Sequence, residues 1–452
     1  MGPPSARVRA LPRAGATQSL IAVACVAALS ALPGCGGGGG STTTTTAGIA
    51  GVPTHTCGKV EYGGEGGADR LIVSDLPLQG DSAERSSQQE QAIRLILDQR
   101  GWKAGATSVA YQACDDSIEK TGLWDPATCR SNANAYARDR QVLGVIGTYN
   151  SGCAAEEIPI LNRAAVAMIS PGNTAVCLTE PSKGCKGGQP ESLYPSGSRN
   201  YARVVPNDAF QGAALAEFAS GEGIEKPFVL YASSDPTSTG QAENFRGAAQ
   251  ALGLELAGYE TWDQEAKSYA PLFEKVKRSG ADGVVLAGLI EQNGAQVIKD
   301  KVEVLGPNAD VPLIAFDGFA QQATIDDSGF ASDGMFASVP GSTPENLPAK
   351  GEAFVSDLKE MTNGQPVEQF APFAGEAAAV LLDAIADAGT NREGIAKAVL
   401  ATRGGGRILH PYDIEPSGDP SVGPISVLKA DSSFGPFREI TPQAAAVRAA
   451  RG

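Results

Sequence analysis

Short apolar runs and amphipathic segments alternate along residues 69–320. The apolar runs have the length of buried strands, and the segments between them have helical spacing; in Ser86–Arg100, for example, four apolar side chains share one face. Such alternation predicts parallel sheets with helices on both faces. The expected strands are Arg70–Ser74, Thr107–Ala113, Val142–Thr148, Ala165–Ser170, Pro227–Ala232, Leu254–Glu260, Asp282–Ala287 and Pro312–Phe316. The expected helices, besides Ser86–Arg100, are Gln241–Leu252, Tyr269–Arg278 and Ala295–Val304.

The alternation breaks once, at Pro181–Pro206, a stretch rich in glycine and proline. Roughly 385 residues are available to fold, which is more than a single hydrophobic core usually serves. We therefore expect an α/β protein of two doubly wound parallel-sheet lobes, with the chain crossing between them near this break. Beyond Val339 the pattern predicts helices and then short strand-like runs: Ala349–Thr362, Phe373–Ala388 and Arg392–Ala401, followed by Tyr412–Glu415, Pro424–Leu428 and Pro436–Ile440.

The first 46 residues have the pattern of an export signal followed by a linker. Three arginines precede a ten-residue apolar core, Leu20–Leu29, which is too short for a membrane span. The Leu-Pro-Gly-Cys sequence at 32–35 resembles a bacterial lipobox, so we expect cleavage after residue 34 and acylation of Cys35. Cleavage by the ordinary signal peptidase near the same point is the alternative. The glycine and threonine tracts at 36–46 cannot form a core and would serve as a tether.

The charge of the chain excludes some partners. It carries 36 basic and 51 acidic side chains, a formal net charge of −15. Residues 1–34 contain three arginines and no acidic residue, so cleavage shifts the net charge by three units, from −15 to −18. An acidic chain without a basic run is not expected to bind nucleic acid or an anionic lipid surface. Membrane attachment would therefore depend on the lipid alone, outside the cytoplasm.

Six cysteines remain after those of the signal and the lipobox: Cys57, Cys114, Cys129, Cys153, Cys177 and Cys185. An even number in an exported chain indicates disulfides. No metal site is expected, because no CxxC pair occurs and the chain has two histidines. Cys177 and Cys185 close a short loop and are expected to pair. Two of Cys114, Cys129 and Cys153 are expected to pair with each other, and the partner of Cys57 is left open.

Two strands in the first half of the chain end in polar turns. Val142–Thr148 runs into Thr148–Gly152, and Ala165–Ser170 runs into Ser170–Thr174. In an open parallel sheet such turns lie at the carboxyl edge, where these folds bind ligands. They offer hydroxyls and backbone N–H groups and no catalytic base. The only histidines, His55 and His410, suggest no Ser-His-Asp set, so we expect binding of a small polar molecule without catalysis or a cofactor.

An ordered set of motifs over residues 69–440 resembles the type I periplasmic substrate-binding proteins of the branched-chain amino acid class, which serve ABC transporters. The motifs are Leu71–Gly80 (LIVSDLPLQG), Tyr111–Asp116 (YQACDD), Val145–Ser151, Met168–Thr174, Arg203–Gly212 (RVVPNDAFQG) and Ala315–Gly318 (AFDG). The resemblance implies two lobes joined by a multi-segment hinge that closes over the ligand. It implies this division: signal 1–34, lipidated tether 35–56, first lobe 57–205 and 340–410, second lobe 206–339 and 411–440, and tail 441–452.

The resemblance also implies which residues contact a ligand. The carboxylate of an amino acid is held in the first lobe, and the matching positions are Asn150, Ser151, Gly152, Gly172, Asn173 and Thr174. A helix beginning near Gly152 would direct free N–H groups at that anion. The ligand's ammonium meets a second-lobe carboxylate, a position held by Asp317. The alternatives are ordinary structural roles: a helix cap for Ser151, turn residues for Thr174 and the asparagines, and a solvated loop for Asp317.

The chain departs from the family at two aromatic positions. Thr239 precedes Gly240 where an aromatic residue is frequent, and Leu289 takes the place of another, so a wider or differently shaped pocket is expected. Asp235 either enters the same turn or caps the next helix. The implied protein is a monomeric binding protein whose permease and ATPase partners are separate subunits. The alternative is a ligand-sensing module of the same fold that signals to a separate membrane partner.

Overall fold

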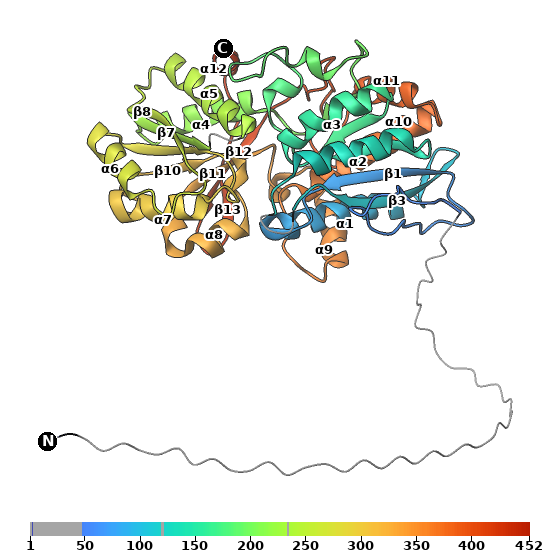
Figure 1. Ribbon diagram of the computed structural model, residues 1–452, viewed down its shortest axis with the longest axis horizontal. Helices are drawn as coiled ribbons and strands as arrows, with labels where there is room; N and C mark the ends of the chain where they lie inside the picture. Colours follow the sequence, from blue (N-terminus) through green and yellow to red (C-terminus); the bar gives the residue numbers. More distant parts are fainter. Residues whose placement is uncertain (1, 3–47, 119–121, 233–234) are drawn as a thin grey trace. The chain divides into compact units, whose positions relative to one another are not determined.

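The computed structural model describes residues 2, 48–118, 122–232 and 235–452 (Figure 1). The expected signal core Leu20–Leu29 and the expected lipid attachment at Cys35 lie outside the described residues. None of the helices in the described part of the chain is long and apolar enough to cross a membrane.

The first lobe is built on a six-stranded sheet in the order β2-β3-β1-β4-β5-β6. All neighbours in it are parallel except β2, which is antiparallel to β3 at one edge. The central strand β1 is buried along nearly its whole length, as expected for a strand covered on both faces. The strands are β1 (Arg70–Leu76), β2 (Lys103–Ala104), β3 (Thr107–Asp115), β4 (Val142–Gly147), β5 (Ala167–Ser170) and β6 (Tyr201–Arg203).

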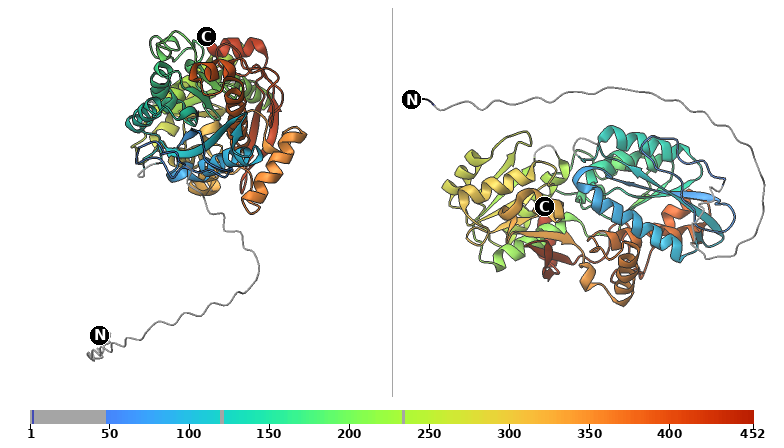
Figure 2. Two further views of the ribbon diagram at one scale, coloured as in Figure 1. Left: turned by 90° about the vertical axis from the view of Figure 1, so that its right-hand side faces the viewer. Right: turned by 90° about the horizontal axis from the view of Figure 1, so that it is seen from below.

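Six helices share the hydrophobic core of this sheet (Figure 1, Figure 2). They are α1 (Ala83–Gln99), α2 (Pro126–Arg138), α3 (Ser151–Arg163), α9 (Ala349–Met361), α10 (Ala371–Ala388) and α11 (Arg392–Leu400). The helix α10 packs beside α1 although nearly 300 residues separate them along the chain. It is rich in alanine and buried on almost every side, which suits a helix enclosed between a sheet and other helices.

The second lobe is built on a seven-stranded sheet in the order β13-β12-β11-β10-β9-β7-β8. Five strands run parallel, and β12 and β13 add an antiparallel edge. Both sheets are therefore mixed, where the sequence pattern predicted parallel ones. The strands are β7 (Pro227–Ala232), β8 (Gly258–Trp262), β9 (Gly283–Ala287), β10 (Leu313–Ala315), β11 (Phe336–Pro340), β12 (Ile425–Ala430) and β13 (Phe434–Ile440).

Helices cover both faces of the second sheet and form two cores. Along β7, Val229 belongs to one core and Phe228 and Leu230 to the other, because neighbouring side chains of a strand point to opposite faces. One face carries α4 (Asp208–Gly221), α5 (Pro236–Ala251) and α12 (Ala444–Arg451). The other carries α6 (Ala270–Ser279), α7 (Gly294–Leu305) and α8 (Gln322–Ser328). The two-lobe α/β fold expected from the sequence is confirmed.

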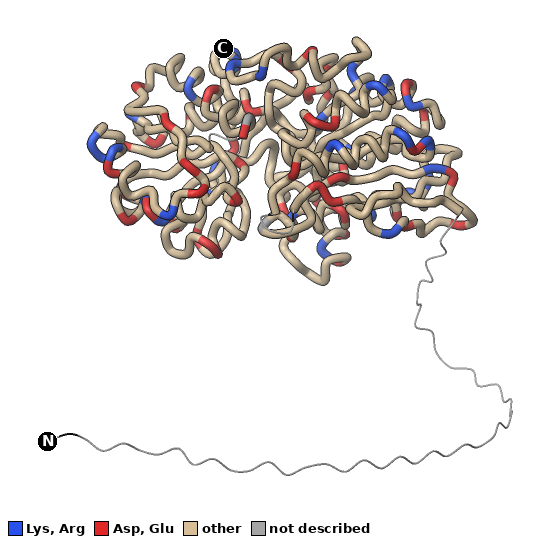
Figure 3. Tube along the Cα trace, viewed as in Figure 1, with Lys and Arg blue, Asp and Glu red and all other residues tan. Residues whose placement is uncertain are grey.

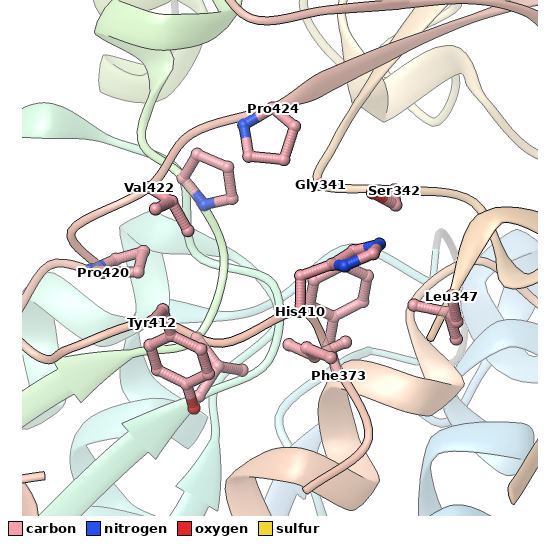
Figure 4. A pocket seen from close by; sticks show the side chains of 12 residues that line it. Gly341, Ser342, Leu347, Phe373, His410, Tyr412, Pro420, Val422 and Pro424 are labelled. Atoms are coloured by element: carbon pink, nitrogen blue, oxygen red, sulfur yellow. The ribbon is translucent and has the colours of Figure 1, made fainter. Parts of the chain in front are cut away.

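Three segments carry the chain between the lobes: β6 to α4, β11 to α9, and α11 to β12. Their residues meet around a small, mostly apolar hollow (Figure 4). Its walls include Val204 and Pro206 from the first segment, Ser342 from the second, and Tyr412 and Pro424 from the third. Pro206, Pro420 and Pro424 restrict the backbone at these crossings.

Both ends of the folded part differ from expectation. Val52, expected in the tether, is buried in the first core, and its N–H donates to Gln112 Oε1 at 2.8 Å. Glu61 pairs with Tyr111 of β3 through two backbone hydrogen bonds. At the other end the expected tail contains α12, whose Val447 and Ala450 are buried against α4 and α5. The expected strand Tyr412–Glu415 forms only an isolated bridge to Pro420.

The six cysteines form three disulfides: Cys57–Cys114, Cys129–Cys153 and Cys177–Cys185. The last is the short-loop bridge expected from the sequence. The second joins α2 to α3 and is the pair expected among three candidates. The first joins the N-terminal segment to β3. All three bridges lie in the first lobe or in the segment that leaves it, near the turns that follow its strands.

Candidate functional site

A small pocket lies between the carboxyl-edge turns of the two lobes. Eight of the ten expected contact residues line it: Asn150, Ser151, Gly152, Gly172 and Thr174 from the first lobe, and Asp235, Leu289 and Asp317 from the second. The other lining residues are Trp124, Tyr149, Thr237 and Gln241. Asn173 and Thr239 do not line it. The expected residues therefore converge although up to 167 positions separate them along the chain.

The two first-lobe turns are held together by hydrogen bonds between them. The hydroxyl of Ser151 accepts the N–H groups of Thr174 and Ala175, each at 3.1 Å. The Ser151 hydroxyl hydrogen is still able to donate to a ligand, because these bonds use only its lone pairs. Asn173 is fully buried; its amide donates to Tyr149 O at 2.8 Å and its Oδ1 accepts from Tyr201 Oη at 3.0 Å. Asn173 is thus a structural residue that shapes the turn.

The N-terminus of α3 borders the pocket through Asn150, Ser151 and Gly152. Asn150 has the extended backbone of an N-cap, yet its side chain makes no capping hydrogen bond. Unsatisfied N–H groups and the positive end of the helix dipole favour an anion at such a position. Gly152 allows close approach here, since a Cβ atom would lie 2.1 Å from Trp124 Cζ2. The anion site expected from the sequence therefore has an uncapped helix end as its base.

Aromatic walls come from the first lobe instead of the second. Trp124 covers Gly152, and Tyr149 covers Gly172, where a Cβ atom would lie 2.6 Å from the ring. The Tyr149 hydroxyl receives a hydrogen bond from the buried Arg85, whose guanidinium lies over the same ring. The pocket is thus narrower on this side than the missing second-lobe aromatics suggested.

The second lobe contributes a buried carboxylate. Asp317 follows β10 in a short 3₁₀ turn and is 6% exposed. Its Oδ1 accepts the amides of Gln211 and Gln241, each at 3.0 Å. Burial raises the pKa of Asp317 to about 6, and those two amides and Arg85 oppose the rise. A buried carboxylate of this kind gains most from a cation placed beside it.

The remaining second-lobe candidates have structural partners. Asp235 caps α5, accepting the N–H groups of Thr237 and Ser238, while burial raises its pKa. Of the two roles left open for Asp235, the structure therefore shows the cap, although the residue also borders the pocket. The Thr239 hydroxyl donates to Asp235 O at 3.3 Å, away from the pocket. Leu289 supplies an apolar wall.

Three further carboxyl groups are buried beside the Cys129–Cys153 disulfide: Asp75, Asp116 and Glu157. Asp116 and the two sulfurs are the one group among the described residues whose potential metal-ligand atoms lie within 4.8 Å of one another. Both sulfurs belong to a disulfide, so they are not thiolates and the set does not suit a metal. Burial raises the pKa of all three carboxyls, that of Asp75 to about 6.

Sequence reasoning missed Trp124, Thr237 and Gln241. Trp124 lies just before α2 and not in a turn that directly follows a strand, and Gln241 lies in the second turn of α5. The only signal for Gln241 was its spacing of six residues from Asp235 on one helix, which by itself does not single out a ligand contact. Trp124 and Gln241 reach the pocket only because the folded lobes place them there.

Comparison with known proteins agrees with this geometry. The profile of a family described as periplasmic binding protein matches residues 76–406. A Leu/Ile/Val-binding protein homologue of Brucella abortus is 24% identical over 376 residues, which are 82% of this chain and 93% of that protein.

Two solved structures share the fold. The leucine-binding protein LivK from Thermotoga maritima superimposes with a TM-score of 0.71 at 21% identity, covering 82% of this chain and 99% of that one. A solute-binding protein of an ABC transporter from Rhodopseudomonas palustris, in complex with p-hydroxybenzoic acid, has a TM-score of 0.68 at 15% identity, covering 83% and 97%. At these identities the structural similarity establishes the architecture alone.

Proposed function

The chain belongs to the periplasmic binding protein family, and from this premise we propose that it captures an amino acid or a closely related zwitterion between its lobes. The family consists of extracytoplasmic solute-binding proteins of ABC transporters and not of enzymes. The resemblance seen in the sequence is thereby confirmed at the level of the family. The class of ligand is our proposal, and it rests on the pocket.

One observation supports it above all: opposite charges are expected at opposite walls of the same pocket. The first lobe offers the uncapped N-terminus of α3 and the Ser151 hydroxyl, which suit a carboxylate. The second lobe offers the buried carboxylate of Asp317, which suits an ammonium group. A zwitterion that bridges the two walls would stabilise the closed arrangement of the lobes, since neither wall alone can pair with both charges of the ligand.

An aromatic carboxylate is the second candidate, and Trp124 and Tyr149 favour it. Their rings line the pocket beside the anion-directed helix end, and the relative from Rhodopseudomonas palustris binds such an acid. An aromatic acid without an amino group, however, leaves Asp317 buried without a cation. We therefore rank it below an amino acid, while the Brucella relative's name supports the amino acid class.

We further propose that the protein is an import lipoprotein. The lipobox-like sequence supports acylation of Cys35, and the glycine and threonine tracts support a tether from the membrane to the folded part. A separate permease and ATPase would receive the ligand, with this chain acting as a monomer. Acidic and basic residues are interspersed along the trace in Figure 3, and the formal net charge of −15 disfavours attraction to anionic lipid.

A thermal-shift and calorimetry panel tests the ligand class. L-Leucine, L-isoleucine, L-valine, L-threonine and p-hydroxybenzoate are compared on the wild type, on Asp317→Asn and on Asp327→Asn, an exposed aspartate of the same lobe. A compound at 100 times its dissociation constant adds about 2.7 kcal/mol of stability. Asp317→Asn should weaken amino acid binding about ten- to hundredfold through loss of a charged hydrogen bond, and Asp327→Asn should not.

Two results would overturn the proposal. If p-hydroxybenzoate alone stabilises the protein and binds Asp317→Asn at least as tightly, the ligand is an aromatic acid. If an amino acid binds but Asp317→Asn changes its affinity by less than twofold, the ammonium lies elsewhere.

A further inference from the structure

The carboxylate at the cation wall of the pocket is one of a pair. Asp208, the first residue of α4, is fully buried beside Asp317. The amide nitrogen of Gln211 lies 2.9 Å from Asp208 Oδ1 and 3.0 Å from Asp317 Oδ1. The amide nitrogen of Gln241 likewise lies 3.3 Å and 3.0 Å from the same two oxygens. Two amides thus clamp two acids, whose facing oxygens are at most about 6 Å apart.

The nearby cations are already engaged by other groups. Arg203 faces Asp208, but its Nε lies 2.7 Å from Asp419 Oδ1, so its charge is largely compensated. Arg85 acts on Asp317 from the first lobe, yet it donates to the Tyr149 hydroxyl and lies 3.9 Å from Glu368. No other charged group is a main influence on either acid. Neither cation therefore neutralises the pair.

The second oxygen of Asp208 has room for a proton. Asp208 Oδ2 is buried and accepts no hydrogen bond of ordinary geometry from the described residues, although the Thr174 hydroxyl lies beside the carboxyl group. Two ionised carboxylates about 6 Å apart repel each other, at an effective dielectric constant near 20, by the equivalent of about two pH units. Burial and Asp317 raise the pKa of Asp208 to about 8, while that of Asp317 is about 6. Burial and mutual repulsion therefore both favour a single proton on the pair near neutral pH.

We propose that Asp208 is a positioning residue for the cation wall: with Asp317 it forms an electrostatically coupled unit that holds one proton, on Asp208, and so presents one negative charge to the ligand. Asp208 does not line the pocket and acts through Asp317 and Gln241, which do. Because Thr174 of the first lobe accompanies Asp208, the unit lies where the lobes meet. Its functional meaning rests on the proposed function, since a unit of one charge matches the single ammonium of a zwitterion. The coupling of the two acids is a property of the free protein.

The test is a pH titration of the ligand-free mature chain labelled with ¹³C in its aspartate side chains, followed by carboxyl NMR from pH 5 to 9. The wild type should show one step of the pair near pH 6 and one near pH 8. Asp208→Asn should remove the upper step and keep the lower one. Asp317→Asn should leave one step of the pair, that of Asp208, and its midpoint should lie more than one pH unit below 8 because the neighbouring charge is gone. Asp75→Asn, a control in the other lobe, should leave the upper step unchanged.

Two outcomes would overturn the proposal. One is an Asp208→Asn protein that has lost no carboxyl step above pH 7, because the upper step then belongs to another buried acid such as Asp116. The other is an Asp208 step that moves by less than half a unit in Asp317→Asn, because the acids are then uncoupled. If Asp208→Asn does not fold, the shift of the Asp208 step in Asp317→Asn still measures the coupling between the two acids. These results are independent of the ligand panel, so the failure of one proposal is distinguishable from the failure of the other.

Discussion

Replacing Glu157 with glutamine should stabilise the protein at neutral pH. Glu157 is fully buried in α3, and its carboxyl group faces that of Asp75, so that one proton between them would form a hydrogen bond. Asp75 also accepts the amide of Asn132 at 3.1 Å and the hydroxyl of Tyr136 at 3.0 Å. Asp75 is therefore the acceptor and Glu157 the protonated donor, which agrees with a raised pKa for Glu157 and with its hydrogen bond lowering that of Asp75.

The size of the effect follows from the proton that folding must take up. In the unfolded chain Glu157 titrates near its ordinary pKa of 4.5. The folded state binds more protons than the unfolded state between that value and the raised one, so stability falls as the pH rises through this range. At 1.36 kcal/mol per pH unit, holding this carboxyl group protonated at pH 7 against an unfolded pKa of 4.5 costs at most about 3 kcal/mol. A glutamine amide donates to Asp75 without this cost.

Urea unfolding with the disulfides intact, at pH 7 and pH 4.5, measures the change. We expect Glu157→Gln to raise the free energy of unfolding by up to about 3 kcal/mol at pH 7 and by less than about 0.5 kcal/mol at pH 4.5. Glu156→Gln is the matched control: Glu156 forms a partly exposed ion pair with Arg130, so its loss should cost under about 1 kcal/mol. A Glu157→Gln protein that is destabilised at pH 7, or changed equally at both pH values, would refute the protonated donor.

Three further predictions concern the ends, the bridges and the hinge. Replacing Cys35 with alanine should release the protein from membranes or block its processing, as membrane fractionation would show; a processed variant still in the membrane fraction would contradict acylation. The unfolded, unreduced mature protein should contain no free thiol by thiol titration, since all six remaining cysteines are paired; two or more reactive thiols would contradict this. Asp419→Ala should lower the free energy of unfolding in urea by about 3–5 kcal/mol, because it leaves Arg203 buried and unpaired; a loss under about 1 kcal/mol would show that Arg203 finds another partner.

The sequence determined the order of strands and helices well, because each depends on neighbouring residues. The apolar runs around Val142–Gly147 and Pro227–Ala232 are strands, and the helix predicted at Phe373–Ala388 is α10. The predicted boundaries were wrong where tertiary contacts decide the local structure. Leu254–Glu260 became β8 at Gly258–Trp262, since pairing with β7 sets which residues are in register. The expected tail folds as α12 because α4 and α5 offer it an apolar surface.

The pocket residues and the disulfides also divide into those with a local sequence signal and those without one. The polar turns after β4 and β5 were visible because a strand followed by hydroxyls and glycine is a local pattern, and a short loop made Cys177–Cys185 the natural pair. Cys57–Cys114, by contrast, joins residues 57 positions apart and carried no local signal.

Only the tertiary structure decided what each wall of the pocket does. It turned Asn173 into a buried turn residue and Asp235 into a helix cap, and it replaced the missing second-lobe aromatics with Trp124. It also placed Asp208 beside Asp317, 109 positions later in the chain, through two shared amides. The sequence specifies the chemical type of each side chain. Its charge state and its partners depend on burial and on neighbours that packing brings from elsewhere in the chain.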